Sequence, residues 1–117
     1  MSNTPVNVRI TNDQPPYTVT LNPPGPYRIT ERNSTVSLTL DQSSAQAGFK
    51  MFGIGYREPD AQGQLSAVVS TNRNQNDTLT VTDAKTENGR FEFVVLYQDQ
   101  SGGTTVYGHD PVIDNED

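Results

Sequence analysis

Short runs in which apolar and polar residues alternate recur along the chain, and they constrain its fold more than any other feature. Because successive side chains of a β-strand point to opposite faces, this alternation is typical of strands with one buried face. Five runs have the pattern: Val6/Val8/Ile10, Tyr17/Val19/Leu21, Val36/Leu38/Leu40, Leu65/Ala67/Val69 and Leu79/Val81. Gly, Pro, Asn and Asp separate the runs, as in turns. We therefore predict an all-β protein, an immunoglobulin-like antiparallel β-sandwich of about 7 to 9 short strands.

Prolines place the strands of the amino-terminal third at sheet edges. Pro15-Pro16 and the segment from Pro23 to Pro26 interrupt this region, and proline cannot donate to a sheet ladder. We expect residues 27–30 to form a short edge strand. Residues 42–47 could form at most one turn of helix, and no longer helix is predicted.

Two further runs, residues 49–56 and 91–97, are apolar on both faces. Strands of this kind belong in the middle of a sheet or beneath a partner. A Gly-rich turn follows the second run and should fold it back onto residues 104–108 as a hairpin. This places the second run at strand F of an immunoglobulin-type sandwich, leading into strand G.

If these two runs are neighbours in one sheet, one set of their apolar side chains fills the core and the other lies on the outward face. The outward set, which we predict as a candidate interface, is Phe52, Ile54, Tyr56, Val94 and Leu96. An exposed apolar patch on a small domain marks self-association or a partner surface. The alternative is that a loop or the carboxy-terminal tail of the same chain covers the patch.

Composition narrows the classes of function. The chain has 117 residues, of which 32% are apolar, and we expect one domain over residues 1–117 with an acidic tail from about residue 114. The net charge of −6 argues against a nucleic-acid partner. Cysteine is absent, which excludes disulfides and cysteine-zinc sites and fits a reducing compartment. We find neither a secretory signal nor an apolar run of membrane-spanning length, so we expect a cytoplasmic protein with no membrane contact.

Catalytic candidates are few. The single histidine, His109, precedes Asp110, and two more carboxylates lie in Glu58-Pro59-Asp60. Acid proteolysis needs two carboxylates close enough to share a proton. Asp110 could meet Glu58 or Asp60 if the last strand ran beside the loop after residue 56. The preferred interpretation is structural: Asp110-Pro111 ends one strand segment, and Glu58-Pro59-Asp60 makes a turn. We expect no cofactor and no metal, since the acidic tail lacks the spacing of a calcium loop.

Four segments of the carboxy-terminal half resemble the DP-EP family of small bacterial β-sandwich proteins. They are residues 48–54 (GFKMFGI), Arg57-Glu58-Pro59, residues 78–83 (TLTVTD) followed by Gly89-x-Phe91, and His109-Asp110-Pro111-x-Ile113-x-Asn115. The resemblance implies a compact sandwich. For at least some members it also implies aspartic-peptidase-like activity, including cleavage of their own chain. By that analogy Asp110 is the first catalytic candidate and His109 its companion. No second catalytic Asp can be matched.

Two hypotheses of function follow. The first is a self-associating or protein-binding module that uses the outward apolar face, so that the expected partner is a second copy of the chain or another protein. The second is an aspartic-type peptidase with self-cleaving activity that uses Asp110 and a second carboxylate.

Overall fold

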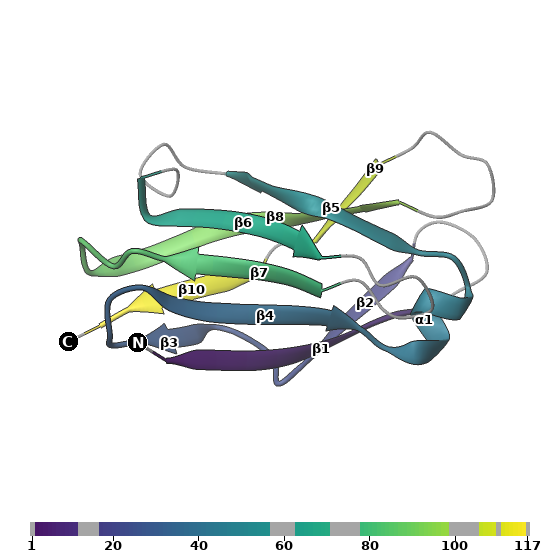
Figure 1. Ribbon diagram of the computed structural model, residues 1–117, viewed down its shortest axis with the longest axis horizontal. Coiled ribbons are helices and arrows are strands. Elements are labelled where there is room, and N and C mark those ends of the chain that lie inside the picture. Colours follow the sequence, from purple (N-terminus) through teal and green to yellow (C-terminus); the bar gives the residue numbers. More distant parts are fainter. Residues whose placement is uncertain are drawn as a thin grey trace.

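A computed structural model describes residues 2–11, 17–56, 63–70, 78–98, 106–109 and 111–116 of the chain. Ten strands and one short helix form in these residues (Figure 1). The first five strands are β1 (Asn3–Thr11), β2 (Thr18–Asn22), β3 (Tyr27–Ile29), β4 (Ser34–Leu40) and β5 (Lys50–Tyr56), with α1 (Gln42–Gln46) between β4 and β5. The others are β6 (Leu65–Ser70), β7 (Thr78–Asp83), β8 (Gly89–Gln98), β9 (Val106–His109) and β10 (Val112–Asn115).

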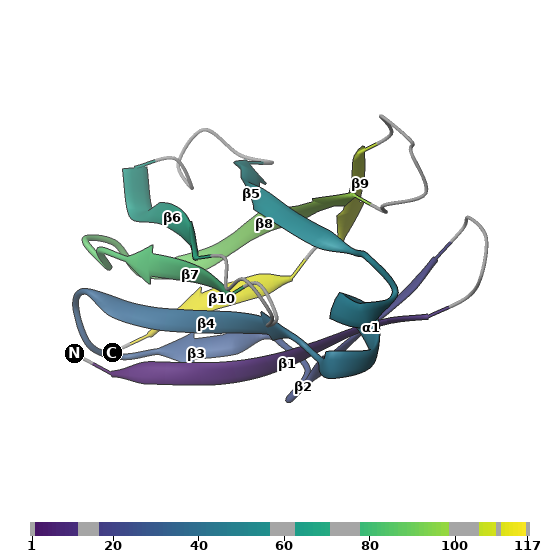
Figure 2. The same ribbon diagram turned by 45° about the vertical axis from the view of Figure 1, so that its right-hand side comes forward.

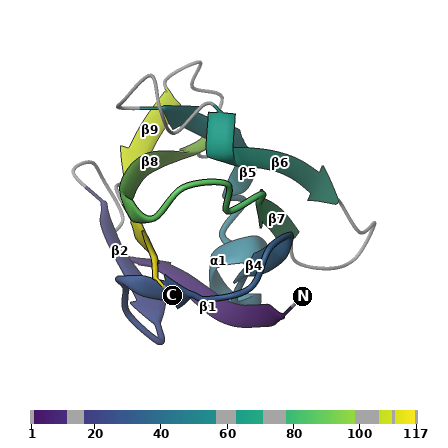
Figure 3. The same cartoon turned by 90° about the vertical axis from the view of Figure 1, so that its left-hand side faces the viewer.

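The strands form two sheets that pack face to face, which confirms the predicted β-sandwich. One sheet has the order β2-β1-β4-β7-β6, and the other has the order β3-β10-β8-β5, with β9 also paired to β8. Viewed end on, β2 and β6 lie on opposite sides of the molecule, as edge strands of one sheet do (Figure 3). The orders β4-β7-β6 and β10-β8-β5 are those of strands B-E-D and G-F-C in an immunoglobulin domain. The placement of residues 91–97 at strand F is thereby confirmed.

Alternation in the sequence puts the core between the sheets. The five alternating runs all turn their apolar residues inward, and Val36, Leu38, Leu79 and Val81 are fully buried. Two pairs of strands are parallel, β1 with β4 and β3 with β10, whereas the remaining pairs are antiparallel. Both parallel pairs involve the Pro-rich amino-terminal third, which crosses from one sheet to the other between β2 and β3.

β9 and β10 are two parts of one strand. Val95 pairs with His109 and Glu92 pairs with Val112, so both parts keep the same antiparallel register against β8. The Phe93 N–H donates to the Pro111 carbonyl between them, at 3.2 Å. Pro111 has no N–H to donate to a ladder, yet the register is the same before and after it.

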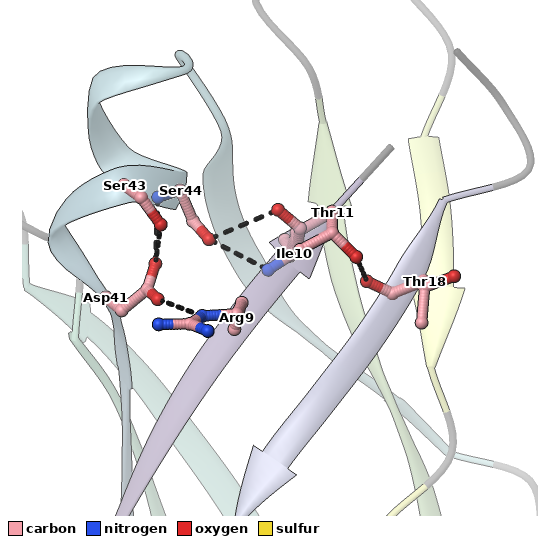
Figure 4. Close-up of polar contacts among 7 residues, drawn as sticks. All are labelled: Arg9, Ile10, Thr11, Thr18, Asp41, Ser43 and Ser44. Carbon is pink, nitrogen blue, oxygen red and sulfur yellow. Dashed lines mark hydrogen bonds and ion pairs between the residues drawn. The ribbon is translucent and has the colours of Figure 1, made fainter. Parts of the chain in front are cut away.

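Helix α1 closes one end of the sandwich, beside the end of β1 (Figures 1 and 2). Its N-cap, Asp41, accepts a hydrogen bond from the Ser44 N–H at 2.8 Å. Asp41 also forms an ion pair with Arg9, whose Nε lies 2.8 Å from Asp41 Oδ2. The Ser44 hydroxyl in turn accepts the Ile10 N–H at 2.8 Å (Figure 4). The pairing of β1 with β4 ends at Val8, so Ser44 takes the place of a strand partner for Ile10.

Four aromatic rings close the same end of the core from the inside. Tyr17 meets Phe49 and Tyr107 edge to face, with ring centroids 4.9 Å and 5.0 Å apart, and Tyr97 stacks on Tyr107 at 5.5 Å. Such pairs add to the stabilisation from burial alone. Burial raises the pKa of the Tyr97 phenol, which therefore stays neutral at physiological pH.

We predict that Asp41→Ala lowers the free energy of unfolding by about 1 kcal/mol, because it removes the N-cap of α1. Burial alone would raise the pKa of Asp41, but hydrogen bonds from Arg9, Ser44 and Ser43 outweigh it and lower the pKa to about 2. A lowered pKa gives stability that is present above the unfolded value of 3.8 and lost as the pH falls toward 2.

Urea unfolding of wild type and Asp41→Ala between pH 2 and pH 7 measures both effects. The difference between the two proteins should be full at neutral pH and shrink below pH 4, as Asp41 becomes protonated. A difference that stays constant over this range would contradict the role of the carboxylate.

Candidate functional site

Of the four predicted catalytic residues, the structure describes one. Asp110, Glu58 and Asp60 lie outside the described residues, so their meeting stays a prediction. His109 ends β9, pairs with Val95, and therefore shares the inward face of its sheet.

His109 lines a groove of about 360 Å³ on the open side of the sandwich. The groove runs between the edge of β2 and the strand formed by β9 and β10. Its walls are Val19, Thr20, Leu21, Pro24, Gly25, His109, Pro111 and Val112. Among the described residues that line this groove, His109 is the only titratable side chain.

The predicted apolar interface does not form one surface. β5 and β8 are neighbours, which is the condition for the predicted interface, but a β-bulge between Met51 and Gly53 shifts their register by one residue. Because one extra residue turns every later side chain to the opposite face, Ile54 and Tyr56 pair with buried Val95 and Phe93 and face inward. Ile54 and Tyr56 therefore do not share the outer face of Val94 and Leu96, and the Tyr56 side chain is 41% exposed.

Of the remaining predicted interface residues, Val94 and Leu96 are described by the structure and Phe52 is not. Val94 and Leu96 lie on the outer face of β8, opposite Gly55 and Gly53 of β5, and both are half-buried. On the other side Gly108 leaves room for Val94, since a Cβ there would lie 2.5 Å from Val94 Cγ1. The side chain of Phe52 lies outside the described residues.

The strand edges differ in their protection against pairing with other chains. Pro23 and Pro24 follow β2, β3 has three residues and the charged Arg28, and β5 carries Lys50 and the bulge. Proline, charge, short length and bulges all blunt an edge. β6 has none of these, since its sequence LSAVVS contains no charge, proline or glycine.

Val68 is the exposed apolar residue of this edge. Its side chain is 68% exposed, on the outer face of β6 between Ser66 and Ser70. Sequence reasoning identified Leu65, Ala67 and Val69 as core residues of this strand but did not single out Val68. The sequence signal for Val68 is that a valine stands where the alternating pattern of this strand calls for a polar, outward-facing residue.

Hydrogen bonding at β6 shows which backbone groups point away from the sheet. The Ala84 N–H donates to the Gln64 carbonyl at 2.8 Å, toward β7, and the Tyr56 hydroxyl donates to the Leu65 carbonyl at 2.9 Å from the opposite side. Since the direction alternates along an antiparallel strand, the N–H and C=O groups of Ala67 and Val69 point to the open edge. In the described part of the chain no strand pairs with that edge.

A buried polar pair joins the two sheets at the end opposite α1. Asn115 of β10 donates to Asp83 Oδ1 of β7 at 3.3 Å and to the Glu87 carbonyl at 3.0 Å. The Lys85 N–H also donates to Asp83 Oδ1, at 2.9 Å. Within the described part of the chain, the buried atoms Asp83 Oδ2 and Asn115 Oδ1 have no hydrogen-bond partner. Desolvation raises the pKa of Asp83, against the lowering effect of Asn115 and Lys85.

We predict that Asp83 makes the protein less stable as the pH rises. A raised pKa means that the folded protein binds the Asp83 proton more tightly than the unfolded chain, so the stabilisation is full below about pH 4 and is lost above it. The variant Asp83→Asn has nearly the same shape and does not titrate.

Urea unfolding of both proteins from pH 3.5 to pH 7 is the measurement. The stability of wild type relative to Asp83→Asn should decrease across this range, because only wild type must bury a charge or hold a proton. A relative stability independent of pH would show that Asp83 titrates normally.

Comparison with known protein families identifies the family of the chain. Among the described residues no group of three or more His, Asp or Glu side chains is placed to hold a metal ion, and no helix there is long and apolar enough to cross a membrane. None of the curated proteins compared with the chain matches it. The sequence model of the DP-EP family matches residues 3–117. This match covers essentially the whole chain, which therefore belongs to the DP-EP family.

Proposed function

We propose that the protein is a self-associating module in which β6 pairs with β6 of a second copy. The observation that carries the proposal is the row of N–H and C=O groups that Ala67 and Val69 direct to the open edge. An unprotected edge of this kind is a template for pairing with another chain. The partner is a second copy, because the edge is complementary to itself.

Self-complementarity follows from the sequence of β6. In antiparallel pairing centred on Val68, Ser66 lies opposite Ser70, Ala67 opposite Val69, and Val68 opposite its own copy. The outer face then reads Ser-Val-Ser in both directions. A two-fold axis through Val68 gives the isologous contact of a symmetric dimer.

The backbone geometry agrees with the same register. Ala67 and Val69 would form hydrogen-bonded pairs, with two N–H···O bonds in each and four in total around the two-fold axis. The two Val68 residues would form the pair without hydrogen bonds, in which Cα atoms lie about 4.5 Å apart and side chains are closest. The exposed apolar surface of Val68 would thus be covered by its symmetry mate.

We predict that wild type dimerises and that Val68→Lys does not. The substitution brings two like charges together across the two-fold axis, which opposes pairing. It also changes the net charge from −6 to −5, so general repulsion between copies decreases. Sedimentation equilibrium at about 10 µM to 1 mM protein covers the range of weak association.

Thr80→Lys is the matched control. Thr80 of β7 pairs with Val68 and lies on the same outer face, one strand further from the edge. The same charge at this position should leave the dimer in place. A monomeric wild type at all concentrations, or equal loss in both lysine variants, would contradict pairing through β6.

A peptidase that uses Asp110 is the second candidate, and the location of His109 in the groove beside β2 favours it. At about pH 4 a carboxylate pair can hold one shared proton. We predict that wild type incubated there releases a discrete fragment that Asp110→Asn does not, as measured by the mass of the intact chain. Acid itself cleaves Asp-Pro bonds, so a break after Asp110 does not count. If both proteins release the same internal fragment, a catalytic role of Asp110 is excluded.

A further inference from the structure

Asp83 and Asn115, the buried pair that joins the two sheets, each have one side-chain oxygen without a hydrogen bond. Asp83 is fully buried and Asn115 is 2% exposed. Within the described part of the chain, Asp83 Oδ2 and Asn115 Oδ1 have no partner, although Asp83 Oδ1 and Asn115 Nδ2 already meet at 3.3 Å. An ionised carboxylate and an amide oxygen are both acceptors only. If Asp83 is charged, the two oxygens therefore cannot satisfy each other.

The orientation of the Asn115 amide is fixed by its two donors. Its Nδ2 donates to Asp83 Oδ1 at 3.3 Å and to the Glu87 carbonyl at 3.0 Å. Turning the amide over would bring Asn115 Oδ1 against these two acceptors. The remaining atom of the amide is therefore an oxygen, which needs a donor.

A single proton on Asp83 supplies that donor. A protonated carboxyl group has one O–H to donate. A proton on Asp83 Oδ2 would bond to Asn115 Oδ1, beside the existing bond from Asn115 Nδ2 to Asp83 Oδ1. Acid and amide would then form a neutral pair with two hydrogen bonds. This removes two unsatisfied acceptors and a buried charge, each of which opposes folding.

Few charged groups act on Asp83 from the elements around it. Its partners in the sheet are Ser34 of β4 and Leu65 of β6, which are uncharged. Burial is the largest effect on the pKa of Asp83 and raises it, against the lowering effect of the Lys85 charge in the following turn. The Glu87 side chain of the same turn is exposed. Desolvation therefore favours the protonated form of Asp83.

The charges of the last strand lie on its other face. Asp114 and Glu116, on either side of Asn115, alternate with it and point away from the core. Asp114 meets Arg90 of β8 at 3.6 Å, and Glu116 meets Arg28 of β3 at 3.1 Å. These two carboxylates are thus paired with arginines outside the core.

We infer that Asp83 holds a proton in the folded protein and donates it from Oδ2 to Asn115 Oδ1, so that this proton fastens β10 to β7. β10 also carries β3, since Ile113 to Asn115 pair with Tyr27 to Ile29. Loss of the proton leaves two acceptors unpaired and a charge in the core, which loosens β10 and β3 from β7. The pair thus makes the attachment of these two strands depend on pH.

The direction of the pH dependence follows from the raised pKa of Asp83. The folded protein binds the proton more tightly than the unfolded chain, whose value is 3.8. The attachment is therefore complete below about pH 4 and is lost as the pH rises through the pKa of the folded protein.

The first test is ¹³C NMR of the wild-type side chains as a function of pH. We expect Asp83 Cγ to titrate with a midpoint above 3.8, the value of a free side chain. The side-chain amide resonances of Asn115 should shift with the same midpoint, because the two groups share the proton. A midpoint at or below 3.8 overturns the inference, as does an Asn115 amide that does not respond when Asp83 titrates.

The second test is amide hydrogen exchange in wild type and in Asp83→Asn. The variant copies the protonated form, because its Nδ2–H takes the place of Oδ2–H. The reporter is the Glu116 amide, which donates to the Ile29 carbonyl at 2.9 Å. The ratio of its exchange rate in wild type to that in Asp83→Asn should rise about threefold or more from pH 4 to pH 7. Since intrinsic exchange is the same in both proteins at each pH, the ratio isolates the effect of the proton.

Asp114→Asn is the matched control. It removes the same charge from the same strand, but on the outer face, where the Asp114 side chain is 22% exposed. The exchange rate of wild type relative to this variant should not rise over the same pH range. A ratio for Asp83→Asn that is independent of pH, or an equal rise for both variants, overturns the inference.

Discussion

The structure depends on how it pairs or shields the backbone N–H and C=O groups at the edges of its two open sheets. A sandwich that does not close into a barrel leaves four such edges, and each exposed row of groups invites another strand. The chain blunts β2 and β3 with proline and charge and β5 with a bulge. Among the described strands, none pairs with the outer edge of β6. The proposed self-association uses this edge.

At each end of the sandwich, where strand pairing stops, polar side chains form hydrogen bonds that connect the elements. At one end the Ser44 hydroxyl, in place of a neighbouring strand, accepts the hydrogen bond of the Ile10 N–H. Asp41 caps the helix that contains Ser44. At the other end Asn115 bridges β10 to Asp83, which is fully buried. Asp41 is stabilised as an anion, whereas the burial of Asp83 opposes its charge. The two ends therefore respond in opposite directions to a change in pH.

The sequence predicted the sandwich because its signal is local. Alternation identifies each strand and its buried face. The pairing of β5 with β8 was a condition of the interface prediction, and the expected central position holds for β8 but not for β5, which is an edge strand. The faces of Ile54 and Tyr56 could not be predicted, because they depend on one extra residue at the bulge. The joining of Asp83 and Asn115, which are 32 positions apart, also depends on tertiary packing. Catalytic pairing of Asp110 with Glu58 or Asp60 stays a prediction, since these residues lie outside the described part of the chain.

The common register of β9 and β10 limits how this part of the chain can change length. Tyr107, His109, Pro111, Ile113 and Asn115 all share one face against β8. Inserting or deleting one residue between Tyr107 and Ile113 would turn Ile113 and Asn115 outward and bring Val112 and Asp114 in. At β5, by contrast, the bulge already absorbs one extra residue. Among members of the family, length changes near Pro111 should therefore occur in steps of two residues, whereas single-residue changes are tolerated near Gly53.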